Sequence, residues 1–187
     1  MQPHFAVPNL AVPTFAPASD AGLPLHIITE RTLDAWLAQQ DGTTAGWARS
    51  MGFAGAWGQV VVLPGADGTI RGALIGAGTP KTRQRQRFLL AAAAAKLPEG
   101  TYALASDLPA DLSAEVECFG WLMAQYAFDR YAKTTGAKAR LIAPDGVDAA
   151  RVEAMAAGET FTRTLINTPA EDMGPAELQQ AVESLAE

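Results

Sequence analysis

The sequence predicts an α/β fold, with a layered, mixed β-sheet flanked by helices. Segments with a strand pattern alternate with segments with a helix pattern along most of the chain, which is typical of that class. Residues 58–78 contain two strand-like segments joined by the reversal "PGADG", so one strand pair is expected to be antiparallel. The length of 187 residues, with 49% apolar and 18% charged residues, fits one domain with its own hydrophobic core.

The chain begins with a proline-rich stretch over residues 1–24. Its prolines are Pro3, Pro8, Pro13, Pro17 and Pro24. Because proline blocks both helix and sheet hydrogen bonds, we expect an extended N-terminal arm with one edge strand.

The strongest strand signals follow this arm. Residues 23–30 form an apolar run of the kind found in buried strands. Residues 31–42 have apolar side chains at helical spacing, and Asp41-Gly42 is expected to end that helix. Residues 59–63 and 69–75 are strand-like. The first half therefore predicts a strand, a helix and a hairpin.

The second half predicts helices that alternate with two short strands. Ser113 is a candidate N-cap of the longest of these helices, and Pro175 occupies a position favoured in the first turn of the last one. The predicted segments are a helix over 85–100, a strand over 101–106, a helix over 113–133, a strand over 139–146, and helices over 147–167 and 174–187.

Composition argues against several classes of protein. The formal net charge is −6 and the sequence pI is about 4.9, so a broad nucleic-acid-binding face is not expected. No apolar run approaches the roughly 20 residues that span a bilayer, and the N-terminus lacks the regions of a secretory signal. The one cysteine, Cys118, leaves no internal disulfide. We therefore expect a cytoplasmic protein without membrane contact.

A glycine-containing loop, "LIGAGTPK" over residues 74–81, follows a predicted strand. Gly76 and Gly78 could let backbone N–H groups bind a phosphate. The dinucleotide fingerprint needs a third glycine where this chain has Lys81. A plain strand-to-helix turn is therefore favoured over a phosphate loop.

Residues 81–87, "KTRQRQR", form the only basic cluster. On one helix, Lys81 and Arg85 would be like charges four residues apart, as would Arg83 and Arg87. The cluster could contact phosphate or an acidic partner, but only Phe88 offers an aromatic neighbour. A solvated or subunit-contacting helix face is the favoured interpretation.

The remaining candidate side chains form no catalytic set. We expect structural roles for both histidines, an inert thiol for Cys118, helix-start or junction roles for three carboxylate pairs, and core or interface roles for the tryptophans. No nucleophile, metal or Walker motif accompanies them. No catalytic, cofactor-binding or metal-binding residue is therefore predicted. The residues weighed are His4, His26, Glu115/Glu117, Asp145/Asp148, Glu171/Asp172, Trp36, Trp47, Trp57 and Trp121.

Three segments carry a resemblance to a known family. The stretch "LINTPAEDMGPAEL" over residues 165–178 resembles the interdomain segment of the leucine aminopeptidase (cytosol aminopeptidase) metallopeptidases. Residues 126–131, "YAFDRY", resemble the family's Y-x-F-x-x-Y/F element on the helix before that segment. Residues 52–68 look like the N-terminal region of a bacterial branch. The positions matched to the interdomain junction are Asn167, Thr168, Pro169, Met173 and Pro175.

The resemblance implies a two-domain enzyme of which this chain is the first part. The family joins an N-terminal α/β domain, similar to macro domains, to a catalytic domain that binds two divalent metals, zinc or manganese. The catalytic motifs resembling "GKGxxFDTGG" and "NTDAEGRL" are not in this sequence, and "NTPAEDM" has Pro169 where the second motif has aspartate. The implied organisation is an arm over 1–24, a domain over 25–166, and a junction and linker helix over 167–187.

The resemblance also sets the functional expectations. The whole protein would be a metal-dependent leucyl aminopeptidase that removes N-terminal residues from peptides and assembles as a hexamer. This chain would be inactive alone, would pair with its own catalytic domain, and would serve assembly and active-site access. Two alternatives remain open. One is a macro-like module that binds a nucleotide or ADP-ribose, and the other is a stand-alone interaction domain.

Overall fold

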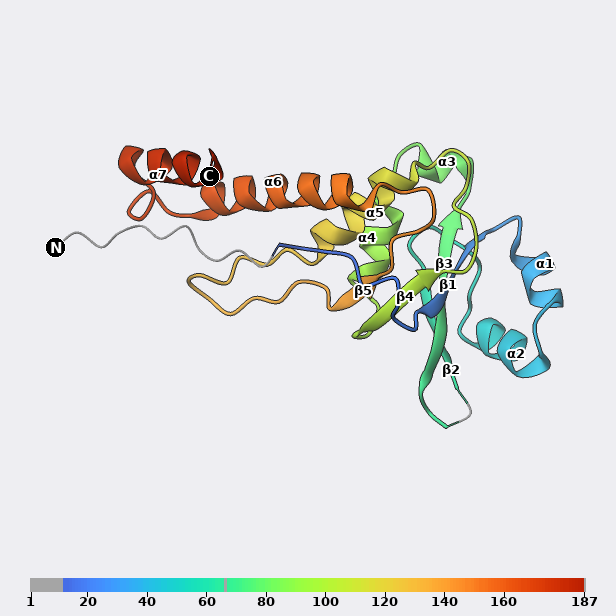
Figure 1. The fold of residues 1–187 in the computed structure, drawn as a ribbon. Coiled ribbons are helices and arrows are strands. Elements are labelled where there is room, and N and C mark those ends of the chain that lie inside the picture. The colour runs from blue at the N-terminus through green and yellow to red at the C-terminus, as the bar shows by residue number, and fades with distance from the viewer. Residues whose placement is uncertain (1–11, 66, 187) are drawn as a thin grey trace.

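The architecture is a mixed five-stranded sheet with helices on both faces (Figure 1). It is seen in a computed structural model that describes residues 12–65 and 67–186. The strand order is β2-β3-β1-β4-β5; β2 is antiparallel to β3, and the other neighbours are parallel. The predicted mixed α/β sheet is confirmed. The strands are β1 (Leu23–Thr29), β2 (Val60–Pro64), β3 (Ile70–Gly78), β4 (Gly100–Leu104) and β5 (Ala139–Leu141).

Both faces of the central strands are buried, which explains their continuous apolar runs. In β3, Ala73 and Ile75 belong to a large core cluster, whereas Leu74 between them belongs to a smaller cluster on the opposite face. Side chains from α4, α5 and α6 complete the large cluster, and those from α1 and α2 complete the small one. The helices are α1 (Leu33–Ala38), α2 (Gly42–Ser50), α3 (Pro80–Arg83), α4 (Leu89–Ala94), α5 (Ala114–Ala124), α6 (Ala149–Asn167) and α7 (Pro175–Ala186).

Helix α2 was not expected from the sequence. The aspartate predicted to end the preceding helix instead begins a new one, since the Asp41 carboxylate accepts a hydrogen bond of 2.8 Å from the Thr44 N–H. Aspartate suits this N-cap position because its oxygen satisfies an N–H that has no partner within the helix. The same residue thus separates α1 from α2.

The helix predicted over 85–100 is wrong at both ends, since α4 covers only Leu89–Ala94 and Gly100 already begins β4. Helix α3 is one short turn, and a capping box between Thr79 and Thr82 stabilises its N-terminal end. Phe88 then adopts a left-handed backbone with φ of 60°, and α4 begins only after it. A Cβ built on Gly120 of α5 would come within 2.7 Å of the Phe88 side chain. The close packing of Phe88 on α5 accompanies this break in the helix.

The helix predicted over 113–133 begins as expected but ends at Ala124. Residues 125–138 lie in neither helix nor strand. Ala137 N–H donates to Ala124 O at 2.8 Å, and a Cβ on Gly136 would lie 2.0 Å from Gln125 O. The returning chain therefore packs directly on the helix end, where only glycine fits. The expected helical setting of residues 126–131 is wrong.

The described part of the N-terminal arm lies along the outer edge of the sheet. Ala16 forms a parallel bridge to Ile142, and its N–H donates to Leu141 O at 2.8 Å. Phe15 is buried in the large core cluster and its N–H donates to Glu153 on α6. The expected edge strand is thus a single bridge beside β5. The arm residues 1–11 lie outside the described part of the chain.

Candidate functional site

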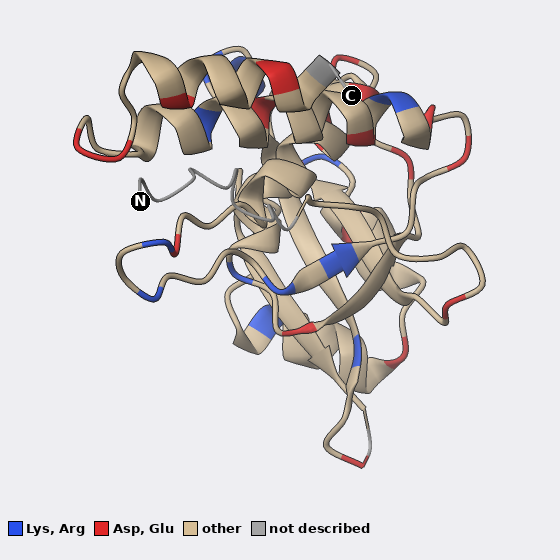
Figure 2. Cartoon of the chain, turned by 60° about the vertical axis from the view of Figure 1, so that its left-hand side comes forward, with Lys and Arg blue, Asp and Glu red and all other residues tan. Residues whose placement is uncertain are grey.

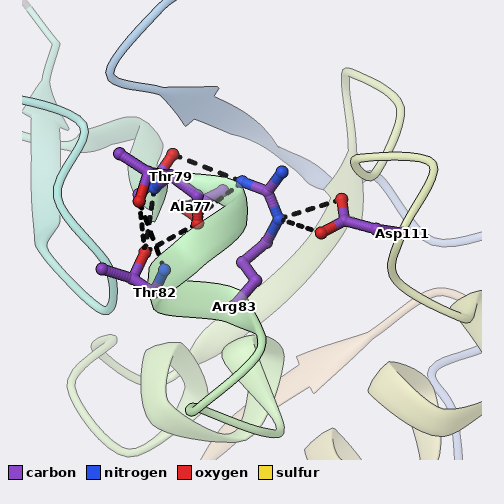
Figure 3. Close-up of polar contacts among 6 residues, drawn as sticks. Ala77, Thr79, Thr82, Arg83 and Asp111 are labelled. Atoms are coloured by element: carbon purple, nitrogen blue, oxygen red, sulfur yellow. Dashed lines mark hydrogen bonds and ion pairs between the residues drawn. The ribbon is translucent and has the colours of Figure 1, made fainter.

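The glycine loop after β3 is engaged by the protein's own backbone. Gly76 N–H donates to Gln59 O and Gly78 N–H to Gly55 O, at 2.8 and 2.7 Å. The next N–H, that of Thr79, donates to the Thr82 hydroxyl at 2.9 Å (Figure 3). A phosphate loop needs N–H groups that are free to donate. The loop therefore acts as a strand-to-helix turn, as the missing third glycine predicts.

Steric space gives the physical reason for both glycines. A Cβ on Gly76 would lie 2.0 Å from Ala56 O, and Gly78 has a positive φ of 61°. The two glycines let the 55–59 segment approach the end of β3. A substitution at Gly76 would therefore disturb the fold whether or not any ligand binds there.

Within the basic cluster of residues 81–87, the Arg83 side chain points into the protein (Figure 3). Its side chain is only 6% exposed, and its Nε donates to both carboxylate oxygens of Asp111, at 3.0 and 2.8 Å. Its Nη1 donates to Ala77 O and Gly78 O. The side-chain hydrogen bonds from Arg83 lower the pKa of Asp111. Arg83 thus ties α3 and the loop after β3 to the segment before α5.

The other basic residues of the cluster do not share one helix face. Lys81 lies on α3, whereas Arg85 and Arg87 lie in the segment before α4, and all three are exposed. The like-charge pairs expected on a continuous helix therefore do not form. Figure 2 shows Lys and Arg scattered among acidic residues over several elements.

The histidine and cysteine environments suit structural roles. His26 packs against Trp36 with ring centroids 5.5 Å apart, and burial and the nearby Arg71 lower its pKa. Cys118 is fully buried in the large core cluster, where burial and the Glu117 charge raise its pKa to about 12. His4 lies outside the described residues.

Two of the three carboxylate pairs are separated by their contacts. Glu115 forms an ion pair with Arg151 at 3.7 Å, whereas Glu117 is buried and accepts a hydrogen bond from Leu90 N–H. Asp148 caps α6 by accepting from Arg151 N–H, while Asp145 lines a cavity beside residues 104–112.

Within residues 12–65 and 67–186, no three His, Cys, Asp or Glu side chains gather in a way that could hold a metal ion. The two metals implied for the family therefore have no fitting ligand set among these residues. No helix in this same range is long and apolar enough to cross a membrane.

The tryptophans divide between core and surface. Trp121 is fully buried and donates its Nε1–H to Ala139 O at 3.2 Å. Trp36 and Trp57 are partly buried against the small and large clusters respectively. Trp47 on α2 is 39% exposed and donates its Nε1–H to Val62 O on the edge strand β2.

The structure brings together two of the three resembling segments, residues 126–131 and the junction. Asn167 Nδ2 donates to the Tyr126 hydroxyl at 3.1 Å, and that hydroxyl lies 3.4 Å from Thr164 Oγ1. Tyr131 donates to Asp172, and Arg130 forms an ion pair with the same carboxylate at 3.6 Å. The non-helical segment after α5 therefore braces the chain where α6 ends.

The five positions matched to the junction differ in burial. Thr168 is buried and donates to Thr164 O at 2.7 Å, which closes the last turn of α6. Asn167 and Pro169 are exposed, Met173 is half-buried, and Pro175 begins α7. At the start of α7, Gly174 N–H donates to Glu177 at 3.0 Å. These contacts define a sharp connection between two helices.

Helices α6 and α7 extend from the sheet, and α7 turns back toward α6 (Figure 1). Along α6 the buried residues recur every fourth position, at Val152, Ala156, Thr160 and Thr164. The exposed large apolar side chains of the two helices include Met155 (51%), Ile166 (76%), Leu178 (47%), Val182 (57%) and Leu185 (67%).

Comparisons with known proteins give consistent matches. Residues 23–144 match the family model described as "M17 aminopeptidase, N-terminal domain". The chain is 30% identical, over 96% of its length, to a "Probable cytosol aminopeptidase" of Leifsonia xyli subsp. xyli (strain CTCB07), and covers 39% of that protein. It therefore spans well under half of that relative.

Solved structures show the same fold. The cytosol aminopeptidase from Coxiella burnetii matches with a TM-score of 0.79 and 29% identity, over 91% of this chain and 36% of that one. A mutant of tomato leucine aminopeptidase matches with a TM-score of 0.59 and 22% identity, over 92% and 41%. The bottromycin maturation enzyme BotP matches with a TM-score of 0.59 and 24% identity, over 89% and 37%.

Proposed function

We propose that this chain, which belongs to the M17 aminopeptidase family and matches the N-terminal domain of that family, is the non-catalytic domain of a metal-dependent leucyl aminopeptidase. The whole protein would remove N-terminal residues from peptides in the cytoplasm. Two divalent metals, zinc or manganese, would belong to its catalytic domain, where such ions polarise a carbonyl and activate water. This domain would serve assembly of a homo-oligomer, a hexamer by family resemblance, and access to the active site.

The proposed organisation follows the contacts described above. We assign residues 1–24 to the arm, 25–166 to the domain and 167–187 to the junction and linker helix. Asn167, Thr168, Pro169, Met173 and Pro175 are the proposed junction residues. The braces from Tyr126 to Asn167 and from Tyr131 to Asp172 support this assignment, because they fix the direction in which the chain leaves α6.

The exposed apolar stripe of α7 is the observation that supports a docking surface for the catalytic domain. Leu178, Val182 and Leu185 follow spacings of four and three residues, so they lie on one side of the helix. An apolar helix face of this kind is stabilised when it packs against another surface. Ile166, at the end of α6, is a further exposed apolar side chain, with 76% of its surface exposed. We propose that the catalytic domain packs on this stripe.

The catalytic part of the proposal is tested by assaying the pure 187-residue chain. A chromogenic leucine amide is incubated with the chain and with added Zn²⁺ or Mn²⁺. We expect turnover no faster than in a blank with the metal alone. Metal-dependent hydrolysis that a chelator abolishes would sink the non-catalytic assignment.

The docking part is tested in the protein that carries both domains. Val182→Glu with Leu185→Glu places two charges on the stripe, and Gln180→Glu places one charge on the opposite side of α7 as the matched control. We expect the double variant to lose subunit assembly in light scattering and to lose peptidase activity, while the control keeps both. Wild-type assembly and activity in the double variant would contradict the docking surface.

A further inference from the structure

A cavity of about 400 Å³ lies between α2 and the β2–β3 hairpin. Trp47 of α2 and Leu63 and Pro64 of β2 supply its apolar wall. The indole is held in place because its Nε1–H donates to Val62 O at 2.9 Å. The residues that line this cavity come from α2 and the β2–β3 hairpin, and they include none from the junction or from α7. Figure 1 shows α2 and the hairpin away from α6 and α7.

Two opposite charges line the same cavity. Asp41 Oδ2 lies 3.7 Å from Arg71 Nη1, and the two side chains are 57% and 51% exposed. Thr44 joins them, since its hydroxyl donates to Asp41 at 2.8 Å and accepts from Arg71 Nη2. At 3.7 Å the two charged groups attract each other without a direct hydrogen bond. Each keeps hydrogen-bonding capacity for a ligand.

We propose that this cavity binds a free α-amino acid with an apolar side chain, of about the size of leucine. The ligand carboxylate pairs with Arg71, its ammonium group pairs with Asp41, and its side chain packs on Trp47 and Leu63. Guanidinium groups match carboxylates in shape and charge. The wall carries one positive and one negative charge, so it suits a zwitterion better than a phosphate.

The size of the cavity fits this choice. A volume of about 400 Å³ lies toward the small end of ligand pockets, which span roughly 300–1,000 Å³. A ligand with few heavy atoms binds weakly, so the expected dissociation constant is millimolar. The proposal does not depend on the proposed peptidase role, because it concerns binding by this chain alone.

The test is a titration of the 187-residue chain with L-leucine, followed by NMR of the indole N–H signals. Replacing Trp47 with Phe identifies the Trp47 signal. We expect that signal to shift saturably at millimolar leucine. L-leucinamide lacks the carboxylate, and 4-methylpentanoate lacks the ammonium group. Each should bind at least about tenfold more weakly, because each loses one charged contact.

A matched pair of variants assigns the carboxylate contact. Arg71→Met keeps the stem but removes the guanidinium, and should weaken leucine binding at least about tenfold. Arg49→Met removes the same charge from an exposed side chain of α2 that does not line the cavity, and should leave binding unchanged. Three results would each overturn the proposal: no shift at high millimolar leucine, equal binding of leucine and leucinamide, or equal loss in both variants.

Discussion

Buried Glu117 is predicted to stabilise the start of α4 from a neighbouring helix. The residue before α4, Phe88, provides no side-chain cap, so the first N–H groups of the helix need another acceptor. Glu117 on α5, only 2% exposed, supplies one, because its Oε2 accepts from Leu90 N–H at 2.9 Å. Glu117→Leu keeps the volume but leaves that buried N–H unpaired. An unpaired buried donor costs about 1–3 kcal/mol, which is the expected loss in free energy of unfolding.

The pH dependence of the same carboxyl sharpens this prediction. Burial raises the pKa of Glu117 above its ordinary value of 4.5, although N–H groups of Leu90 and Leu89 lower it in part. As pH rises above 4.5, the unfolded chain releases this proton first, and the native protein keeps it up to its higher pKa. The native state then binds more protons, so the contribution of Glu117 to the free energy of unfolding falls across that window. Glu117→Gln keeps an oxygen acceptor and cannot titrate.

The measurement is urea unfolding of wild type, Glu117→Leu and Glu117→Gln at several pH values from 4 to 8. Stability of Glu117→Gln relative to wild type should increase as pH rises above 4.5, and Glu117→Leu should be the less stable variant at pH 7. Glu115→Gln is the control on the same helix, since its exposed ion pair with Arg151 is worth roughly 0–1 kcal/mol. Equal stability of Glu117→Leu and wild type at pH 7 would refute the capping role.

Three further predictions concern stability. Thr160→Val should raise the free energy of unfolding by about 1 kcal/mol in urea titrations, because the buried Thr160 hydroxyl has no hydrogen-bond partner among the described residues; a loss would contradict this. Gly76→Ala should lower the free energy of unfolding by several kcal/mol, because the new Cβ clashes with Ala56 O. Gly46 on α2 has open space around it, so Gly46→Ala should raise the free energy of unfolding by about 0.5–1 kcal/mol. Burial and Arg71 lower the pKa of His26. As pH falls below 6.5, the unfolded chain therefore gains this proton first, and the free energy of unfolding falls. His26→Gln should make the free energy of unfolding depend less on pH in this range.

The strands were the most predictable part of the fold. Their apolar runs are set by burial on both faces, which leaves a direct mark in the sequence of residues 23–29 and 70–78. Helix ends were less predictable because tertiary contacts decide them. The left-handed turn at Phe88 accompanies packing on Gly120, and the end of α5 accompanies the close approach of Gly136. Neither contact has a local signal in the sequence.

The candidate sites also differ in how far the sequence predicts them, because a local requirement leaves a sequence signal and a tertiary contact does not. The missing third glycine was enough to disfavour a phosphate loop, because that requirement is local. The cavity beside Trp47 could not be foreseen, since it depends on α2 beginning at Asp41 and packing beside β2. Asp41 carries a recognisable N-cap signal, but the same Asp-Gly pair also predicts a helix end.

Two of the resembling segments show how a sequence pattern can mispredict local structure. Residues 126–131 were expected on a helix, where Tyr126 and Tyr131 would lie five residues apart and on different sides. Because α5 ends at Ala124, the non-helical segment instead lets Tyr126 reach Asn167 at the end of α6 and Tyr131 reach Asp172 in the connection after it. Each contact joins residues 41 positions apart. The two segments therefore form one structural unit, and a change in either should alter how the chain leaves α6.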